Sequence, residues 1–272
     1  MTIWTIEFTL NRASVLQAHR EEDAIRASVE IGSDVLRVEN IRANSKDAAR
    51  QLAEPLANEF LDALAHKHDE PLQIRPLPWA SEHTAESGAR VVTQHVGHAV
   101  SSRASLSLKK IDARGNVVGA YDSDRPGRIE VKPSQAAPYY RRARLSADPF
   151  DEFRNFFLAA ENVADQIRLS CHQGKLNQRA SLAQALRVVF NQNSGSLRQA
   201  AQAVPDFVAA AGLFDDVAGL LHEAYRCQIS HAKAQRSKKV PFNQHDEEAV
   251  RGALPLMQFV ARSLLDYEAA RL

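Results

Sequence analysis

Residues 146–168, SADPFDEFRNFFLAAENVADQIR, contain the signals that decide how the second half of the chain folds. Asp148 is a favourable N-cap, and Pro149 suits the first turn of a helix, where its missing N–H is not needed. The apolar side chains then recur every three or four positions, as they do on one face of a helix. They are Phe153, Phe156, Phe157, Ala160, Val163, Ala164 and Ile167. The stretch therefore predicts a long amphipathic helix over about 149–170.

The chain continues in a helical pattern from this stretch to its C-terminus. The further predicted helices cover about 178–192, 213–234 and 244–271, with a shorter pair around Pro205. Helical elements joined by short links are typical of an all-α bundle. The sequence therefore predicts a helical bundle over residues 147–272.

Residues 1–146 have a different pattern. TIWTIEFTL (2–10) alternates apolar and polar side chains, which is typical of a strand with one buried face. Further strands are predicted over 24–32, 35–41, 89–100, 104–112, 116–122 and 128–133. One helix is predicted over 47–67, with Pro55 starting a new turn or kinking it. The predicted fold class is α+β: an N-terminal mixed domain of unknown role, followed by the helical bundle.

The composition fits an ordinary globular protein. Of 272 residues, 44% are apolar and 25% charged, and the formal net charge of +1 gives no overall sign of a nucleic-acid or membrane partner. Cys171 and Cys227 are the only cysteines, which argues against a disulfide scaffold. No segment resembles a signal peptide or approaches the roughly 20 apolar residues of a membrane span. We expect a soluble cytoplasmic protein with no membrane partner.

Neither a metal nor a cofactor is expected. His95 and His98 lie three apart on a predicted strand, so their side chains point to opposite faces and cannot share an ion. His66 and His68, two apart at the end of a helix, are also poorly placed. The chain has no glycine-rich phosphate loop, G-x-S-x-G or H-E-x-x-H motif.

The most informative stretch is DDVAGLLHEAYRCQISHAKAQRSKK, residues 215–239. Arg226 and His231 stand five apart in it. No Asp or Glu occurs from residue 224 to 245. The cationic residues that follow the motif arginine are Lys233, Arg236, Lys238 and Lys239. A cluster of this kind attracts phosphate groups by charge, so we interpret these lysines and Arg236 as nucleic-acid-binding candidates.

Arg226 and His231 are the candidate catalytic pair. A guanidinium offers forked donors to a phosphate, and an imidazole exchanges protons near neutral pH. Because RNA carries its own nucleophile in the 2′-OH, such a pair can act without a metal. The predicted reaction is transesterification to a 2′,3′-cyclic phosphate and a 5′-OH.

Helix geometry limits this interpretation. Five residues at ~100° per residue leave Arg226 and His231 ~140° apart on a straight α-helix. Arg226 shares its face with His222 instead, while His231 continues an apolar line. The pair can meet on one phosphate if the helix is distorted, if Arg226 reaches around, or if a partner chain supplies one member. The alternative is that His231 is simply a buried core histidine.

Four further residues are supporting candidates: Glu161, Asp165, His222 and Tyr225. Glu161 and Asp165 share a face of the 149–170 helix, from which a carboxylate could position Arg226. The alternative is a solvated charged face. Near the domain boundary, YYRRAR (139–144) combines aromatic and basic residues that suit a single-stranded nucleic acid, or else forms a linker packed against the bundle.

The R-x4-H spacing late on a bundle helix, the preceding Tyr225, the basic run after the histidine and the final long helix resemble the HEPN superfamily. The resemblance covers the C-terminal ~125 residues. It implies a metal-independent RNA endonuclease of the toxin, stress or defence kind. Two copies of the motif would meet in a homodimer, with Arg226 on the scissile phosphate and His231 as general acid or base.

This chain departs from the family pattern at Cys227, where catalytic members place Asn, Asp or His. The alternative is therefore a non-catalytic module for dimerisation or for binding a nucleotide or nucleic acid. Its N-terminal domain would recognise a ligand or an unidentified protein partner. In length and layout the chain also resembles methylamine-utilisation accessory proteins (MauJ-like), which implies no defined chemistry.

Overall fold

The structure is a computed structural model. It describes residues 2–75, 82–85, 90–92, 109–111, 117–120, 127–128, 131, 134–171, 174, 176–230, 239 and 243–271. The chain divides into two compact units, Met1–Val131 and Lys132–Leu272, which we call the N-terminal unit and the C-terminal unit.

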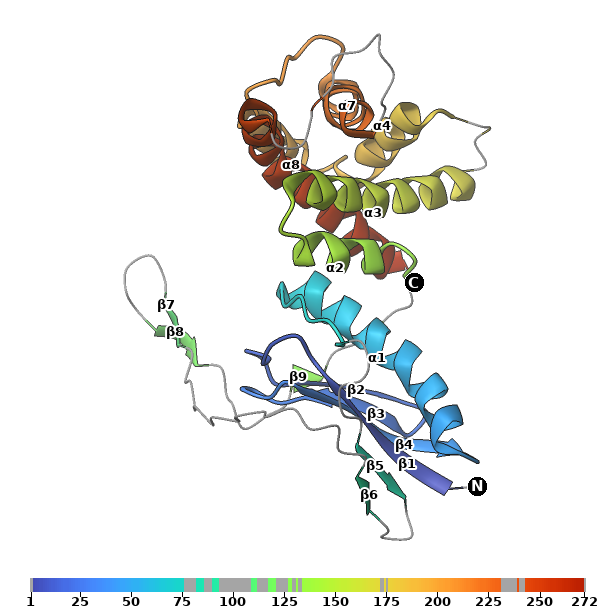
Figure 1. The fold of residues 1–272 in the computed structure, drawn as a ribbon. Coiled ribbons are helices and arrows are strands. Elements are labelled where there is room, and N and C mark those ends of the chain that lie inside the picture. The colour runs from blue at the N-terminus through green and yellow to red at the C-terminus, as the bar shows by residue number, and fades with distance from the viewer. Residues whose placement is uncertain are drawn as a thin grey trace. The chain divides into compact units, whose positions relative to one another are not determined.

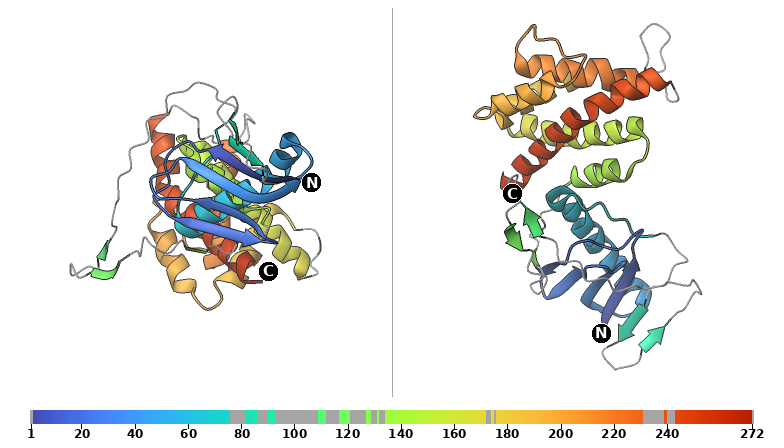
Figure 2. Two further views of the ribbon diagram at one scale, coloured as in Figure 1. Left: turned by 90° about the horizontal axis from the view of Figure 1, so that it is seen from below. Right: turned by 90° about the vertical axis from the view of Figure 1, so that its left-hand side faces the viewer.

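The N-terminal unit is built on one large sheet with a helix over one of its faces (Figures 1 and 2). Seven strands pair in the order β6-β5-β1-β4-β3-β2-β9. They are β1 (Thr2–Thr9), β2 (Ala18–Glu22), β3 (Ile25–Val29), β4 (Val35–Ala43), β5 (Glu82–Ala85), β6 (Arg90–Val92) and β9 (Gly127–Arg128). Neighbouring strands are antiparallel except for β2 and β9. A separate hairpin joins β7 (Lys109–Ile111) and β8 (Val117–Ala120).

Helix α1 (Lys46–His68) provides the other half of this core. Ser45 caps it by accepting a hydrogen bond from the Ala48 N–H, and the helix continues through Pro55 as one element. Alternate strand residues such as Ile6 and Val38 are fully buried beneath it, as are three large side chains of α1: Phe60, Leu61 and Leu64. Each such side chain contributes roughly 1.5–3 kcal/mol of burial free energy.

Strand β2 is absent from the sequence prediction, because its inward side includes a charge. Arg20 is buried, and ion pairs with Glu22 and Glu59 satisfy its guanidinium. The turn to β3 has positive φ angles at Asp23 (48°) and Ala24 (68°), as a tight two-residue hairpin requires. Because this turn lacks the usual glycine, no hairpin was predicted here.

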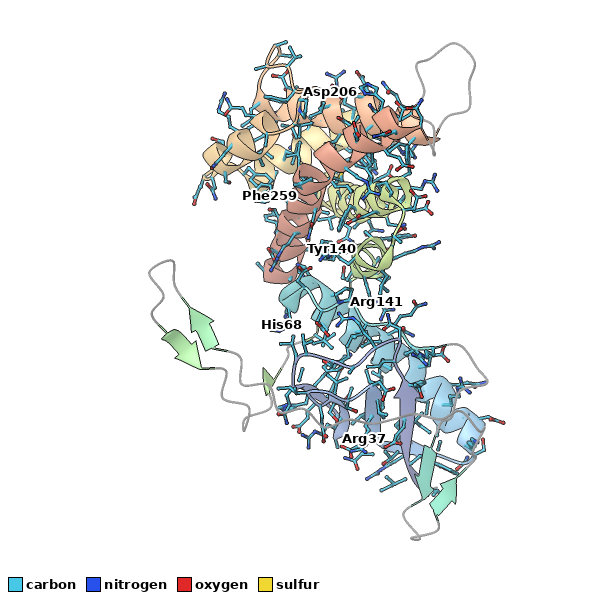
Figure 3. All side chains as sticks on the ribbon, turned by 60° about the vertical axis from the view of Figure 1, so that its left-hand side comes forward. Arg37, His68, Tyr140, Arg141, Asp206 and Phe259 are labelled. Carbon is cyan, nitrogen blue, oxygen red and sulfur yellow. The ribbon has the colours of Figure 1, made fainter. Side chains whose placement is uncertain are left out.

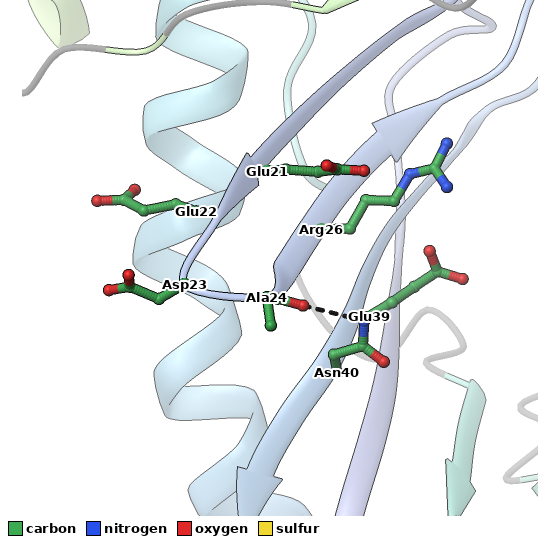
Figure 4. Close-up of a pocket in the computed structure, with 7 residues that line it drawn as sticks. All are labelled: Glu21, Glu22, Asp23, Ala24, Arg26, Glu39 and Asn40. Carbon is green, nitrogen blue, oxygen red and sulfur yellow. Dashed lines mark hydrogen bonds between the residues drawn. The ribbon is translucent and has the colours of Figure 1, made fainter.

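A polar hollow lies at the tip of this hairpin (Figure 4). It is lined by Glu21, Glu22, Asp23, Ala24, Arg26, Glu39 and Asn40. The Asn40 amide closes it by donating to the Ala24 carbonyl at 3.0 Å. The hollow therefore forms where the charged tip of the β2–β3 hairpin lies beside β4.

The C-terminal unit is all helical within the described residues. Its helices are α2 (Ala137–Leu145), α3 (Pro149–Ser170), α4 (Gln178–Val189), α5 (Ser194–Gln202), α6 (Leu213–Gly219), the π-helical segment η1 (Leu220–Arg226), α7 (Cys227–Ser230) and α8 (Gln244–Arg271). Helix α3 lies at the centre and contacts α2, α4, η1 and α8 (Figure 1). Its Phe153, Phe156 and Phe157 belong to one continuous core.

The mixed α+β class and the helical C-terminal region agree with the sequence prediction. The bounds of α3 and α8 match it closely. Three details differ: α2 forms where a loop and linker were expected, Pro205 is preceded by α5 but followed by non-helical residues to Gly212, and residues 220–226 are π-helical. The predicted boundary at residue 146 falls after α2, whereas the compact units divide at Val131.

The start of α3 provides a direct test of the capping prediction. Asp148 accepts a hydrogen bond from the Phe150 N–H at 3.0 Å. Asp148→Ala leaves this donor without its cap and should lower the free energy of unfolding of the C-terminal unit by about 1 kcal/mol. Urea unfolding of the full chain followed by circular dichroism measures the change. Gln166→Ala, on the exposed side of the same helix, should change it by less than about 0.5 kcal/mol; equal effects of the two substitutions would contradict the capping role.

Candidate functional site

The helical run that carries Arg226 changes its hydrogen-bonding pattern just before the motif. Residues 220–226 are π-helical, and the Cys227 N–H donates to the His222 carbonyl, five residues back. In such a turn residues five apart lie one above the other, whereas in an α-helix the spacing is three or four. Single π-helical turns are rare in proteins, and those that occur are often found at functional sites. The turn therefore aligns His222 with Cys227.

His222 is half-buried and held on several sides. Its Nε2 lies 3.2 Å from the Gln178 side-chain oxygen at the start of α4. Its ring centroid lies 6.1 Å from that of Phe157 on α3. The Cys227 sulfur is 3.7 Å from both ring nitrogens, so it packs against the imidazole and is not directed at one nitrogen. Cys227 is itself buried.

Arg226 lies against the same phenylalanine. Its guanidinium carbon is 5.9 Å from the centroid of the Phe157 ring, within the range of a cation–π contact. It also interacts electrostatically with Glu161 on α3. Because Arg226 and His222 are four residues apart, both project from one side of the helix onto Phe157. The structure therefore gathers an imidazole, a guanidinium and a carboxylate around one aromatic ring.

Glu161 is the acidic member of this cluster. Partial burial raises its pKa, and the Asp165 carboxylate raises it further, while Arg226 and a hydrogen bond from Gln178 lower it; burial is the largest of these effects. Asp165 is exposed and paired with Arg168 at 3.4 Å. Of the two carboxylates predicted on this face, Glu161 is the one turned towards Arg226.

Tyr225 lies on another side of the helix. Its ring is fully buried, 5.5 Å from that of Phe153, and its hydroxyl donates to Asp206 at 2.8 Å. Lys239 lies over the ring at 4.8 Å and 3.9 Å from the Asp206 carboxylate. Burial, and then the Asp206 carboxylate, raise the pKa of Tyr225. Asp206 and Tyr140, both labelled in Figure 3, lie towards opposite ends of the C-terminal unit.

The remaining predicted site residues, His231, Lys233, Arg236 and Lys238, lie outside the described residues, as do His95 and His98. Lys239 is described, and its backbone N–H approaches the Gln228 carbonyl at 3.4 Å. His66 is buried in α1. Over the described parts of the chain, no three His, Cys, Asp or Glu side chains are grouped so that they could hold a metal ion.

Two members of the cluster, Gln178 and Phe157, were not predicted. Phe157 has the spacing of a core residue and is buried in the core. Its ring also contacts His222 and Arg226. Gln178 is an exposed residue at a helix start, and nothing in its local sequence distinguishes it. The i, i+4 spacing of His222 and Arg226 predicts their shared face, but no comparable signal in the sequence points to Gln178 or Phe157 as their neighbours.

A comparison with known families gives one finding. Residues 136–266 match the family described as methylamine utilization protein MauJ. The match runs from the start of α2 into α8 and includes none of the N-terminal unit. It supports the resemblance to methylamine-utilisation accessory proteins, whereas the HEPN resemblance rests on the sequence pattern alone. No curated protein and no solved structure matches the chain significantly. Among the described helices, none is long and apolar enough to cross a membrane.

The raised pKa of Glu161 predicts a pH-dependent effect on stability. Because the folded state disfavours the charged carboxylate, ionised Glu161 destabilises the fold above its folded pKa and has no such effect below the ordinary pKa of Glu, about 4.3. Glu161→Gln should therefore raise the melting temperature at pH 7–8, and the gain should vanish as the pH falls to 4. Thermal unfolding across this range measures it, with Glu248→Gln on α8 as the exposed control. A gain that persists or grows at low pH would contradict this assignment.

Proposed function

We propose that the C-terminal unit binds single-stranded RNA at Arg226 and cleaves it without a metal, leaving a 2′,3′-cyclic phosphate and a 5′-OH. Arg226 holds the scissile phosphate and His231 exchanges a proton with the reacting oxygens, as the HEPN resemblance implies. The observation that carries the proposal is the placement of Arg226. Its guanidinium lies on Phe157, near the start of a segment (residues 224–245) that contains no Asp or Glu.

Binding is favoured because the guanidinium is ordered before a ligand arrives. The cation–π contact with Phe157 restrains the Arg226 side chain, so less conformational entropy is lost when its N–H groups bind a phosphate. The Glu161 carboxylate interacts electrostatically with Arg226. Since partial burial already disfavours its charge, Glu161 competes weakly with a phosphodiester for the guanidinium.

The basic segment after the motif adds a sequence-independent attraction for RNA. It follows α7, and at its far end Lys239 returns to Gln228 and Tyr225 on the same helical run. Lys233, Arg236 and Lys238 lie between α7 and Lys239 in the sequence. Phosphate contacts of this kind make affinity fall steeply with salt.

The wider setting follows from the same proposal. Two copies of the chain would form a homodimer that brings their motifs together, and the N-terminal unit would recruit a ligand or partner protein. Such an enzyme would act in the cytoplasm in a toxin, stress or defence role.

A second candidate function is supported by Cys227. Its thiol is buried against His222 and cannot make the amide-type hydrogen bonds of an Asn or Asp at this position. A bundle that lacks this orienting group can still bind RNA or a nucleotide, or dimerise, without cutting. The two candidate functions both use Arg226 for binding, and they differ in whether the bound RNA is cleaved.

Binding and cleavage are measured separately on the full chain. Fluorescence anisotropy with a labelled single-stranded RNA should show binding that Arg226→Ala weakens about 10- to 100-fold, because a charged hydrogen-bonded contact contributes about 1.5–3 kcal/mol. Arg262→Ala, an exposed arginine of α8, should leave binding nearly unchanged. Equal losses of RNA affinity in the two variants would contradict the assignment of Arg226 as the phosphate-binding residue.

Cleavage is followed with the same RNA in EDTA. The nuclease proposal predicts a product with a cyclic phosphate, and His231→Ala should abolish it while binding and melting temperature persist. RNA that is bound through Arg226 but never cut would favour the non-catalytic module.

A further inference from the structure

A cavity in the N-terminal unit opens between the first half of α1 and the sheet. Helix α1 forms one wall, and strands β1, β3 and β4 form the other. Its volume is about 760 Å³, which is within the range of roughly 300–1,000 Å³ that is typical of small-molecule sites. The larger apolar residues that line it are Ile3, Ile25, Ile41, Leu52, Pro55 and Leu56. The cavity therefore has the size and the apolar lining of a ligand site.

This lining runs from the core of the unit to its surface. Ile41 is fully buried, and Ile25 and Leu56 are partly buried against the same core. Leu52 lies one helical turn before Leu56, on the same side of α1, and is 52% exposed. Single exposed leucines are ordinary, but Leu52 continues an apolar surface that is already part of a cavity. A ligand in the cavity would shield Leu52 from water, and this burial is favourable in proportion to the apolar area removed from water.

Two hydrogen-bond donors lie where β4 leads into α1. Arg42 precedes the last residue of β4, Gln51 lies in the second turn of α1, and both line the cavity. Within the part of the chain that the structure describes, no hydrogen bond or ion pair engages either side chain. The Asn40 amide, by contrast, already donates to the Ala24 carbonyl. The two donors fit an acidic headgroup, because the forked N–H groups of a guanidinium match the two oxygens of a carboxylate.

Asp23 gives such a ligand a direction. It is the one acidic residue among the described residues that line the cavity, and it lies in the β2–β3 turn, whereas Arg42 lies near the end of β4. Because like charges repel, a bound carboxylate is directed away from this turn and towards Arg42. The chain of the ligand then lies on the apolar lining.

We propose that this cavity binds an unbranched aliphatic carboxylic acid, with its carboxylate on Arg42 and Gln51 and its chain against Ile25, Leu52 and Leu56. A peptide is a poorer fit, because β1, β3 and β4 are each paired on both sides and offer no free edge to a peptide backbone. The proposal goes beyond the RNA site and does not rest on it, since every residue involved belongs to the N-terminal unit.

Octanoate, octanol and octylamine are suitable probes, because they share one apolar chain and differ in their headgroup. Isothermal titration calorimetry of the full chain should show that octanoate binds at least about 10-fold more tightly than the other two, since only a carboxylate accepts charged hydrogen bonds from Arg42. Arg42→Gln should lower the octanoate affinity about 10-fold and leave the octanol affinity unchanged. Arg37→Gln, an exposed arginine of the same strand outside the cavity, should change neither.

Leu52→Asp tests the apolar wall. It should weaken octanoate and octanol alike by about 10-fold, because a charged group replaces the apolar contact. Val15→Asp is the matched control, since Val15 is 50% exposed on the same unit and does not line the cavity. Both side chains are exposed, so both variants should keep the wild-type melting temperature within about 3 °C.

Two results would overturn the proposal. Equal affinities for the three probes, unchanged by Arg42→Gln, would indicate nonspecific apolar binding. Failure of octanoate to bind would also overturn it; if Leu52→Asp then lowers the melting temperature and Val15→Asp does not, the chain itself or a second copy covers the cavity. Neither result bears on the proposed function, because RNA binding is measured with a different ligand and with variants of Arg226.

Discussion

The candidate site depends on the π-helical turn at residues 220–226. Hydrogen bonding over five residues brings Cys227 against His222, and the widened turn packs both His222 and Arg226 onto Phe157. A regular α-helix would instead place Cys227 beside Glu223, four residues back. On the other side of the turn, Tyr225 packs against Phe153, donates a hydrogen bond to Asp206 and lies beneath Lys239. The buried Tyr225 thus has a structural role, whereas His222 and Arg226 lie on a different side of the helix.

This arrangement changes how the R-x4-H pattern is interpreted. On a straight helix Arg226 and His231 diverge, so cooperation on one phosphate needs a distortion or a second subunit. His222 and Arg226 need neither, because they are four residues apart and both pack onto Phe157 in the observed turn. Glu161 and Gln178 complete a polar group within one unit, linked by hydrogen bonds and charge interactions. The family match to methylamine-utilisation proteins covers the helices that build this group and says nothing about its chemistry.

Sequence periodicity predicted the elements whose signals are local. The capped and strongly amphipathic helices α3 and α8 have the predicted bounds, and β1, β3, β4 and α1 follow their alternation or helical spacing. The failures have specific physical causes. Strand β2 buries Arg20 by pairing it with two glutamates, so it has no apolar face to detect, and its turn uses Asp23 and Ala24 in a backbone conformation that favours glycine. The π-helical turn depends on how Tyr225 and Phe157 pack in three dimensions, which spacing along the chain does not encode. Gln178 is part of the site only because α4 begins beside η1.

The register of this turn can be measured directly by nuclear Overhauser effects in the full-length protein. The account predicts contacts from the His222 imidazole protons to the Cys227 β-protons and to the ring of Phe157. If Cys227 instead contacts Glu223, four residues before it, and His222 shows no contact with Phe157, the turn is an ordinary α-helix and the proposed cluster does not form.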